Sequence, residues 1–494
     1  MQETYVLAID QGTSSTKSII FDQNGKALFK ASEPLKTHYL EGNRVEQDPE
    51  AIYQNVLDSV SKCVYGFKSS GGDISGIKAC GISNQRETLV LWDKEGVPLY
   101  NAVVWQCKRS VEICERLKAQ GLEEKLRAKT GLIIDPYFSG TKVIWLYENE
   151  PKIKKAIDAG EVYFGNVDTW LLYKLTGGKS YMTDYTNASR TMFFNLQEKQ
   201  WDQELLWDFN LSGLNLPDLK PSSYHFGETT IEGVLNHEIS ISALIGDSHA
   251  AAFGEGCFEP GTAKATLGTG SSILMNIGSE PKRSKAGMVT TICWSVEGRI
   301  DYALEGIIVS AGSTIEWVRN QLGLFEDHGE LEAICRSLDN NGGVYVVPSF
   351  SGLGAPHWDM SRKASIEGLS FDSTKAHIIR AAVESVPYQI KDVIVAMESD
   401  SGTPLSELKI DGGITSNKFV VQLLADLLKR TVTNIEIADV SALGAAYLAG
   451  LNASVFDSID QLKTLNKEST STNAGSGATE AEQAYLGWQK VIAG

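Results

Sequence analysis

The segment Asp10–Lys17, DQGTSSTK, combines a carboxylate, a glycine turn, four hydroxyls and one cation. Backbone N–H groups in such a turn can cradle phosphate oxygens, and Asp10 can hold Mg²⁺ through water because hard cations prefer carboxylate oxygen. The segment is not a Walker loop, because the second glycine before the lysine is missing. It is not a dinucleotide fingerprint either, because the chain returns as a strand instead of entering a helix. Taken alone, it fits an ordinary surface hairpin equally well.

Two further glycine turns also follow apolar strands. Gly268-Thr269-Gly270 separates two short strands and would supply the second half of a phosphate clamp. Gly412 and Gly413 would let a flat base approach the backbone, which bulkier residues would prevent. A double glycine seen in isolation is more often a plain turn, but the three segments together favour a nucleotide site.

An acidic residue that could act as a base follows another apolar strand. In the segment Ile245–Ala250, IGDSHA, Asp247 is a candidate to accept the proton of an attacking hydroxyl. The alternative is a carboxylate that caps the following helix, predicted over 248–253. Without context, capping is the better interpretation.

Polar and aromatic residues elsewhere suit the binding of a small polyol. Arg86 and Glu87 place a donor and an acceptor side by side, as directional binding of hydroxyls requires. A plain ion pair is the alternative. Trp105 and Tyr137 could wall a sugar pocket, or they could belong to the core.

The elements that must position these residues alternate between strand and helix signals, so we predict an α/β fold that includes antiparallel strands. Strands are predicted at Val6–Ile9 and Ser18–Phe21, joined by a turn over Gln11–Lys17. Asn24-Gly25 predicts a type I′ turn after them. A boundary near Ala251 divides the chain into halves 1–251 and 252–494, and each half opens with a strand, a glycine turn and a strand. We interpret this as duplicated architecture without sequence repetition.

Helix signals are strongest in the second half. Helices are predicted over 376–397, over 441–448 with Gly450 as its cap, and over 481–492. The segment 468–480, rich in Ser, Thr, Gly and Ala, is predicted to be a surface loop.

Length and composition limit the classes of function. A chain of 494 residues suggests two or three domains, and its net charge of −17 argues against nucleic acid or an anionic membrane as a partner. No stretch has about 18 consecutive apolar residues, and the N-terminus does not resemble a secretory signal. Seven scattered cysteines without a C-x-x-C pair indicate reduced thiols in the cytoplasm.

The motifs resemble those of the carbohydrate kinases of the actin–chaperone–hexokinase superfamily, from about Tyr5 to Trp488. NQRET, DPYFSGTK and TDYTNASRTM are more similar to the glycerol kinases of that family than to its xylulose or gluconate kinases. The resemblance implies two actin/hexokinase-like (ribonuclease-H-like) domains with a nucleotide cleft between them. It also implies Mg²⁺-dependent, in-line transfer of the ATP γ-phosphoryl group to a terminal hydroxyl of glycerol.

The resemblance implies a role for each matching residue. Those assigned to the nucleotide and metal are Thr13, Ser14, Ser15 and Lys17 (phosphates), Asp10 (metal), Thr269 and Gly312 (phosphate and nucleotide), and Gly413 and Asn417 (adenosine). Those assigned to the polyol are Arg86, Glu87, Trp105, Tyr137, Asp247 (also the base) and Ser248.

Four departures from the glycerol kinase pattern concern substrate and regulation. Ser248 and Ser272 stand where those kinases typically carry Gln and Phe against the polyol, and Glu316 replaces a nucleotide-site Gln. The loop Gly233–Glu238 lacks the Gly–Arg pattern by which enteric members bind fructose bisphosphate. A kinase for a tetritol, dihydroxyacetone or a pentulose therefore stays an alternative, as does a non-catalytic, actin-like ATP-binding protein. The sequence does not determine the oligomeric state and leaves a homo-oligomer open.

Overall fold

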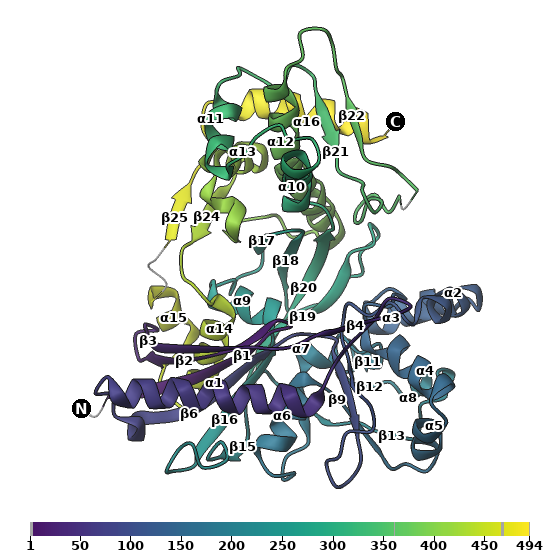
Figure 1. Cartoon of the computed structure of the whole chain (residues 1–494), viewed down its shortest axis with the longest axis vertical. Helices are drawn as coiled ribbons and strands as arrows, with labels where there is room; N and C mark the ends of the chain where they lie inside the picture. Colours follow the sequence, from purple (N-terminus) through teal and green to yellow (C-terminus); the bar gives the residue numbers. More distant parts are fainter. Residues whose placement is uncertain (1–2, 360, 466–468, 494) are drawn as a thin grey trace.

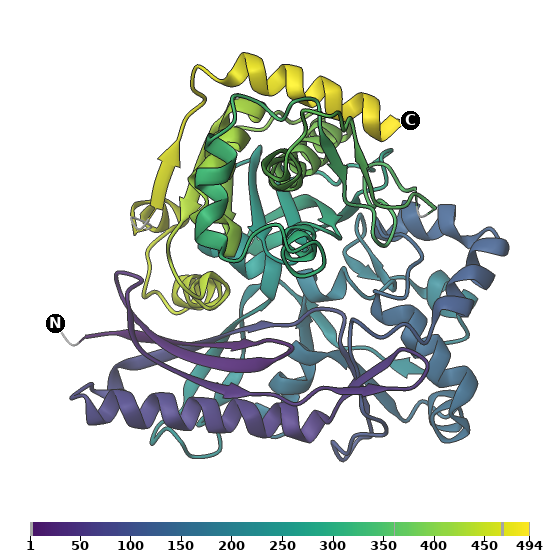
Figure 2. The same ribbon diagram turned by 45° about the horizontal axis from the view of Figure 1, so that its top comes forward.

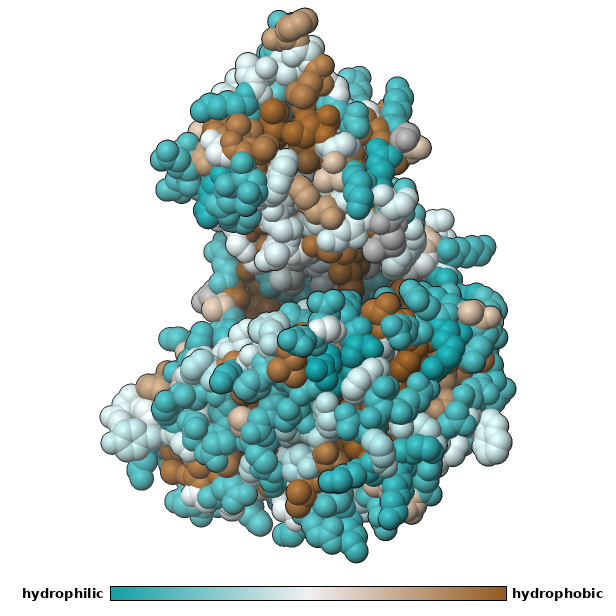
Figure 3. Space-filling view, turned by 45° about the vertical axis from the view of Figure 1, so that its right-hand side comes forward, coloured by the Kyte–Doolittle hydropathy of each residue, from teal (hydrophilic) through white to brown (hydrophobic). Residues whose placement is uncertain are grey.

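The computed structural model describes residues 3–359, 361–465 and 469–493. The chain forms two parts, and a constriction between them is visible in the space-filling view (Figure 3). The long helix α1 (Pro49–Ser69) runs along the part that contains the N-terminus, and α16 (Ala478–Ala493) covers the far end of the other (Figures 1 and 2). Among the described residues, no helix is both long and apolar enough to span a bilayer.

The first sheet is a mixed six-stranded sheet in the order β15-β16-β6-β1-β2-β3. β1, β2 and β3 form an antiparallel meander, whereas β6 and β16 run parallel to β1. Gln11 pairs with Asn84, and Asn84 pairs with Gly246, so three parallel strands end at one edge. The segments that follow these strands carry the predicted phosphate turn, Arg86 with Glu87, and Asp247. The strand bounds are β1 (Tyr5–Gln11), β2 (Ser15–Asp22), β3 (Ala27–Pro34), β6 (Ile77–Asn84), β15 (Ser223–Thr229) and β16 (Ile239–Gly246).

The C-terminal half forms a seven-stranded sheet with a similar topology, in the order β19-β20-β18-β17-β23-β24-β25. β17 and β18 form an antiparallel hairpin, and β23 and β24 run parallel to β17. The repeated arrangement confirms the duplicated α/β architecture. The strand bounds are β17 (Thr262–Leu267), β18 (Ser271–Gly278), β19 (Val289–Val296), β20 (Arg299–Ile308), β23 (Glu407–Asp411), β24 (Thr431–Ile435) and β25 (Ser469–Thr472).

A second mixed sheet in the N-terminal half, β13-β9-β7-β8-β5-β4, carries the aromatic residues. Trp105 follows β8, and its backbone N–H donates to the hydroxyl of Thr88 at 3.2 Å. Tyr137 precedes α4. The bounds are β4 (His38–Leu40), β5 (Arg44–Gln47), β7 (Leu89–Trp92), β8 (Ala102–Val103), β9 (Val162–Asn166), β13 (Leu214–Asn215), α2 (Val111–Ala119), α3 (Leu122–Thr130), α4 (Ser139–Asn149), α5 (Pro151–Asp158), α6 (Val167–Leu175) and α8 (Gln203–Asp208).

One helix late in the chain, α14 (Val440–Asn452), packs against the first sheet and against α9 (Asp247–Gly254). Small residues make this close approach possible. A Cβ on Gly81 of β6 would lie 2.2 Å from the Ala445 carbonyl oxygen, and one on Gly444 would lie 1.8 Å from the Ala250 carbonyl oxygen. The two halves are therefore joined by backbone-to-backbone packing directly behind Asp247. The other helices of this half are α10 (Gly312–Asn320), α11 (Leu331–Arg336), α12 (Lys375–Ser401), α13 (Lys418–Leu428) and α15 (Ile459–Leu465).

Strand pairing in the first hairpin runs further than predicted, and the turn is limited to Gly12–Ser14. The type I′ prediction is wrong, because only Gly25 has the positive φ (75°) that both central residues would need. Here the Asp22 carboxylate accepts hydrogen bonds from the backbone N–H groups of Asn24 and Lys26, which favours a different turn.

Two predictions near the C-terminus also differ from the structure. Gly450 does not cap its helix, since α14 continues to Asn452, and the ring of Phe456 occupies the space that a side chain at 450 would need. Part of the predicted loop forms β25, which pairs with β24; Glu468 lies outside the described residues. The Thr residues of this strand suit an edge strand.

Candidate functional site

A pocket of about 350 Å³ lies between the two halves where the parallel strands end. From the N-terminal half it is lined by seven of the residues predicted from the sequence: Thr13, Arg86, Glu87, Trp105, Tyr137, Asp247 and Ser248. Ala251 and, from the C-terminal half, Lys264, Thr266, Ser272, Asp411 and Ser441 complete the lining. The structure thus brings the predicted polyol residues together at one edge of the first sheet.

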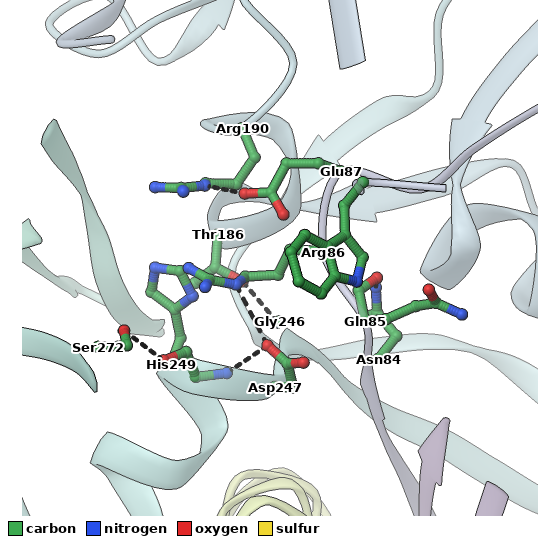
Figure 4. A network of polar contacts seen from close by, with 12 residues as sticks. Asn84, Gln85, Arg86, Glu87, Thr186, Arg190, Gly246, Asp247, His249 and Ser272 are labelled. Atoms are coloured by element: carbon green, nitrogen blue, oxygen red, sulfur yellow. Dashed lines mark hydrogen bonds and ion pairs between the residues drawn. The ribbon is translucent and has the colours of Figure 1, made fainter. Parts of the chain in front are cut away.

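Asp247 is the first residue of α9, directly after β16, and its side chain is 40% exposed toward the pocket. One carboxylate oxygen, Oδ1, accepts the N–H of Ser248 at 2.6 Å and pairs with the Arg86 Nε at 3.2 Å (Figure 4). Within the described chain, no hydrogen bond reaches the other oxygen, Oδ2. The carboxylate is therefore held on one side and leaves an acceptor free, as a general base needs.

Arg86 and Glu87 belong to a buried chain of alternating charges. Arg86 pairs with Glu305 of β20 at 2.9 Å, and Arg190 pairs with both Glu305 at 2.6 Å and Glu87 at 2.5 Å. In Figure 4, Arg190 reaches Glu87 while Arg86 reaches Asp247. Three carboxylates thus alternate with two guanidinium groups.

Burial and charge act in opposite directions on the carboxylates of this chain. Burial raises the pKa of Glu87, with Arg190 and Arg86 opposing it. Burial also raises the pKa of Glu305, but the charges of Arg190 and Arg86 outweigh it and hold that pKa well below its usual range. Glu305 therefore stays ionised, and it neutralises two arginines at once.

The aromatic residues form a wall beside these charges. The rings of Trp105 and Tyr137 meet edge to face with centroids 5.6 Å apart. Lys142 is completely buried in α4, and its Nζ donates to the carbonyl oxygens of Tyr137 and Phe138. Burial lowers the pKa of Lys142 to about 7. Lys142 thus holds the backbone that presents Tyr137, a role that the sequence did not reveal.

The first predicted phosphate turn reaches the pocket through Thr13. The N–H of Gly12 donates to the carbonyl of Ser15, and the carbonyl of Ser14 accepts the N–H of Leu35, so backbone bonds fix the turn. Lys17 does not point freely outward: its Nζ pairs with Asp439 at 2.8 Å, just before α14.

Asp10 lies behind the turn, where its Oδ1 accepts the Ser83 hydroxyl at 3.0 Å. Burial and then the charge of Asp247 raise its pKa to about 6. A carboxylate oxygen is the type of ligand that Mg²⁺ prefers, so Asp10 is a candidate to hold the metal. No cluster of three or more potential protein ligands occurs among the described residues, so bound phosphates and waters would have to supply the rest.

The remaining predicted nucleotide residues form a second group on the C-terminal sheet. The carbonyl of Gly268 accepts the N–H of Gly312, and the carbonyl of Thr269 accepts those of Ala311 and Ser313. A Cβ on Gly412 would lie 2.5 Å from the Leu267 carbonyl oxygen. The glycine turns and the start of α10 therefore touch one another.

Gly413 and Asn417 complete this second group. A Cβ on Gly413 would have no neighbour within 4 Å, so open space faces this residue. The Asn417 side chain caps α13 by accepting the N–H groups of Phe419 and Val420. The pocket lining reaches the group at Asp411 but does not include Asn417.

Three of the four departures noted in the sequence lie on α9, β18 and α10. Ser248 and Ser272 face one another across the halves with their hydroxyl oxygens 3.5 Å apart. Glu316 lies on α10 and pairs with His328 at 2.6 Å and with Arg319 at 3.0 Å. Among the charged residues that sequence reasoning missed are Arg190, Glu305 and Lys142, beside Lys264 and Asp411 of the pocket lining. Arg190, Glu305 and Lys142 lie within recognisable motifs, as single buried charges among apolar and small neighbours.

Comparisons with known proteins identify the family of the chain. The N-terminal domain of the FGGY family of carbohydrate kinases matches residues 5–254, and its C-terminal domain matches residues 263–453. The glycerol kinase of Carboxydothermus hydrogenoformans is 45% identical over 493 residues, which cover 100% of this chain and 98% of the relative. That of Thermoanaerobacter pseudethanolicus is 43% identical over 489 residues and covers 99% and 98%.

Solved structures show the same fold. The structure of Plasmodium falciparum glycerol kinase with ADP superposes with a TM-score of 0.94 at 34% identity, covering 99% of this chain and 98% of the other. A gluconate kinase from Lactobacillus acidophilus has a TM-score of 0.89 at 19% identity, covering 99% and 98%, and shows the fold alone. With both halves matched in order by family domains and by full-length relatives, the chain belongs to the FGGY family of carbohydrate kinases.

Proposed function

We propose that this kinase transfers the γ-phosphoryl group of ATP to a terminal hydroxyl of glycerol and forms glycerol 3-phosphate. The observation that carries this proposal is the free Oδ2 of Asp247, in a pocket that also contains Arg86 and Glu87. The relatives named glycerol kinase support the choice of glycerol, and the ADP in the Plasmodium structure supports the choice of nucleotide.

The described residues suggest a division of labour in the transfer. Arg86 and Glu87 bind two hydroxyls of the polyol, while Trp105 and Tyr137 cover its carbon chain. Asp247 accepts a hydrogen bond from the third hydroxyl and takes its proton late in the reaction, since phosphoryl transfer needs positioning more than strong deprotonation. Closure of the two halves would exclude water and suppress hydrolysis of ATP.

The phosphates would bind between the two glycine turns, against Thr13, Ser14, Ser15 and Lys17 on one side and Thr269 and Gly312 on the other. Gly413 and Asn417 would contact the adenosine. When bound, Mg²⁺ would neutralise charge on the phosphoryl oxygens, and Asp10 would hold it directly or through water. All seven cysteines are free and buried, which supports a cytoplasmic protein.

A coupled assay of ADP release, with and without glycerol, tests the proposal. We expect ADP release to depend on glycerol and on Mg²⁺, with glycerol 3-phosphate as the product by mass spectrometry. Equal rates with and without glycerol would contradict the proposal. Activity on dihydroxyacetone or a tetritol but not on glycerol would support the kinase chemistry and show that the substrate is another polyol or ketose. Ser248 and Ser272 favour this alternative.

A further inference from the structure

Glu305 is the one member of the buried charge chain that comes from the C-terminal half. It lies in the middle of β20, where it pairs with Leu274 of β18 and Val289 of β19. Its side chain is fully buried, and its two oxygens divide between Arg86 (2.9 Å) and Arg190 (2.6 Å). The two arginines of the N-terminal half therefore depend on a single carboxylate of the other half.

The turn that carries Arg86 and Glu87 needs outside support. Glu87 adopts a φ of 59°, a left-handed conformation that is costly for a residue with a side chain. Such strain persists only where surrounding contacts fix it, and here the carboxylate of Glu87 is fixed by Arg190. Arg190 pairs in turn with Glu305 of β20. The contacts that hold the turn therefore extend to the C-terminal half.

We propose that Glu305 is a positioning residue, by which the C-terminal half holds Arg86 and Arg190, and through Arg190 also Glu87, in the orientation that binds a polyol. This inference rests on the proposed function, because it assigns the polyol to Arg86 and Glu87. Its consequence is that polyol affinity depends on a residue outside the half that supplies most of the polyol contacts. Glu305 is not itself among the residues that line the pocket.

A matched buried carboxylate on the same strand separates this role from a purely structural one. Asp301 of β20 accepts from Asn276 at 2.8 Å and pairs with Arg299 at 2.8 Å, and none of these three residues lines the pocket. Its side chain is 3% exposed. Asp301→Asn therefore removes the charge of a buried carboxylate on β20, whose partner Arg299 is 37% exposed, without touching the charge chain.

The kinetic test compares Glu305→Gln with Asp301→Asn. We expect Glu305→Gln to raise the polyol KM at least about tenfold, as expected for one misaligned charged hydrogen bond, with the KM for ATP nearly unchanged. We expect Asp301→Asn to lower the melting temperature but to leave both KM values unchanged. If Glu305→Gln does not fold, Arg190→Lys serves instead, since it keeps the charge but cannot reach two carboxylates in a fixed fork. Unchanged polyol KM, or an equal rise for ATP and polyol, would overturn the inference.

The pH profile of kcat/KM for the polyol gives a second readout. The groups that face Glu87 are Arg190, Arg86, Glu305, Tyr137 and Lys142. Glu305→Gln removes a negative charge that raises the pKa of Glu87 and leaves the direct pair with Arg190, so the pKa of Glu87 falls. Ionised Glu87 then persists to lower pH, and the acidic limb of the profile moves to lower pH in Glu305→Gln but not in Asp301→Asn. An unmoved limb would contradict the inference.

Both measurements use whichever polyol or ketose the natural protein turns over best among glycerol, dihydroxyacetone, erythritol, threitol and xylulose. A natural protein inactive on glycerol would contradict the proposed function but leave this comparison intact. An active natural protein whose polyol KM is insensitive to Glu305 would contradict this inference alone.

Discussion

The indole Nε1 of Trp105 donates a hydrogen bond of 2.9 Å to the hydroxyl of Thr13. Trp105 belongs to the aromatic wall of the proposed polyol site, whereas Thr13 lies in the proposed phosphate turn. The Thr13 hydroxyl also lies 3.3 Å from the Gln85 side-chain oxygen, next to Arg86 in sequence. The two subsites therefore share a direct polar contact, which would let occupancy of one affect the other.

We predict that Trp105→Phe, which keeps the wall but removes the donor, raises the KM for ATP about two- to tenfold. This range corresponds to one neutral hydrogen bond. The polyol KM should change little in this variant, whereas Trp105→Ala, which also removes the wall, should raise both. Steady-state kinetics with each substrate varied in turn would check this. A rise confined to the polyol KM in Trp105→Phe would show that the bond does not couple the subsites.

Asp247→Asn should reduce turnover by roughly 10²–10⁴-fold, because the amide cannot accept the proton of the hydroxyl. The substitution keeps the shape of the side chain, and its Oδ1 contacts with Ser248 and Arg86 lie on the side away from the free oxygen. Binding of Mg·ATP, measured by calorimetry, should stay nearly normal. Near-normal turnover would remove Asp247 from the mechanism.

Two adjacent glycines should respond differently to substitution. A side chain at Gly413 meets open space, so Gly413→Val should leave stability unchanged and weaken ATP binding if the base lies there. Gly412 has a φ of 100°, and a Cβ there would lie 2.5 Å from the Leu267 carbonyl oxygen, so Gly412→Ala should lower the melting temperature. Unchanged ATP affinity in Gly413→Val, measured by calorimetry, would place the adenosine site elsewhere.

Lys17 and Lys30 both pair with Asp439, but only Lys17 follows the proposed phosphate turn. We therefore expect Lys17→Ala to raise the KM for ATP, since it removes a cation beside the phosphates. Lys30→Ala is the matched control, because it removes a partner of the same carboxylate from the more exposed strand β3. Equal effects of the two variants would indicate that the lysines serve only to fix Asp439 and α14.

The parts of the site that follow strand ends could be predicted from the sequence, because an apolar run that stops at a glycine or an acid marks its own boundary. Asp247 and the turns at Gly12 and Gly268 are of this kind, and the structure places each of them directly after a strand or between two paired strands. Their chemical roles stay predictions. Helix ends were harder to predict, as Gly450 shows. This glycine makes room for the ring of Phe456 instead of ending the helix, and that packing depends on tertiary structure.

The charge chain could not be predicted, because its partners are distant in sequence. Arg86 follows β6 of the first sheet, and Glu305 lies in β20 of the C-terminal sheet. They meet only when the two sheets face each other, and no sequence spacing predicts that pairing. The same holds for Lys17 and Asp439. Lys142 was missed for another reason: its acceptors are backbone carbonyl groups four and five residues earlier, and the identity of those residues does not report the contact. A single buried charge within a motif indicates that a partner exists but not which residue it is.

The last prediction concerns substrate breadth and rests on Ser248 and Ser272. Their hydroxyl oxygens lie 3.5 Å apart, and Ser272 lies equally far from Glu305, so neither contact is strong. Relative to Gln and Phe at these positions, the two serines leave more volume and offer small hydroxyls to a ligand. A polyol with one more carbon than glycerol should therefore fit, and glycerol should bind weakly.

The test compares kcat/KM for glycerol, dihydroxyacetone, erythritol and threitol in the natural protein and in a Ser248→Gln/Ser272→Phe double variant. Restoring one hydrogen bond and part of an aromatic contact should lower the glycerol KM roughly ten- to a hundredfold and reduce activity on the tetritols. Each single variant serves as a control, since Ser248→Gln restores the amide that can bond a hydroxyl, whereas Ser272→Phe restores the aromatic contact. Tight and exclusive use of glycerol by the natural protein, with no gain in the double variant, would show that other side chains already close the pocket around three carbons.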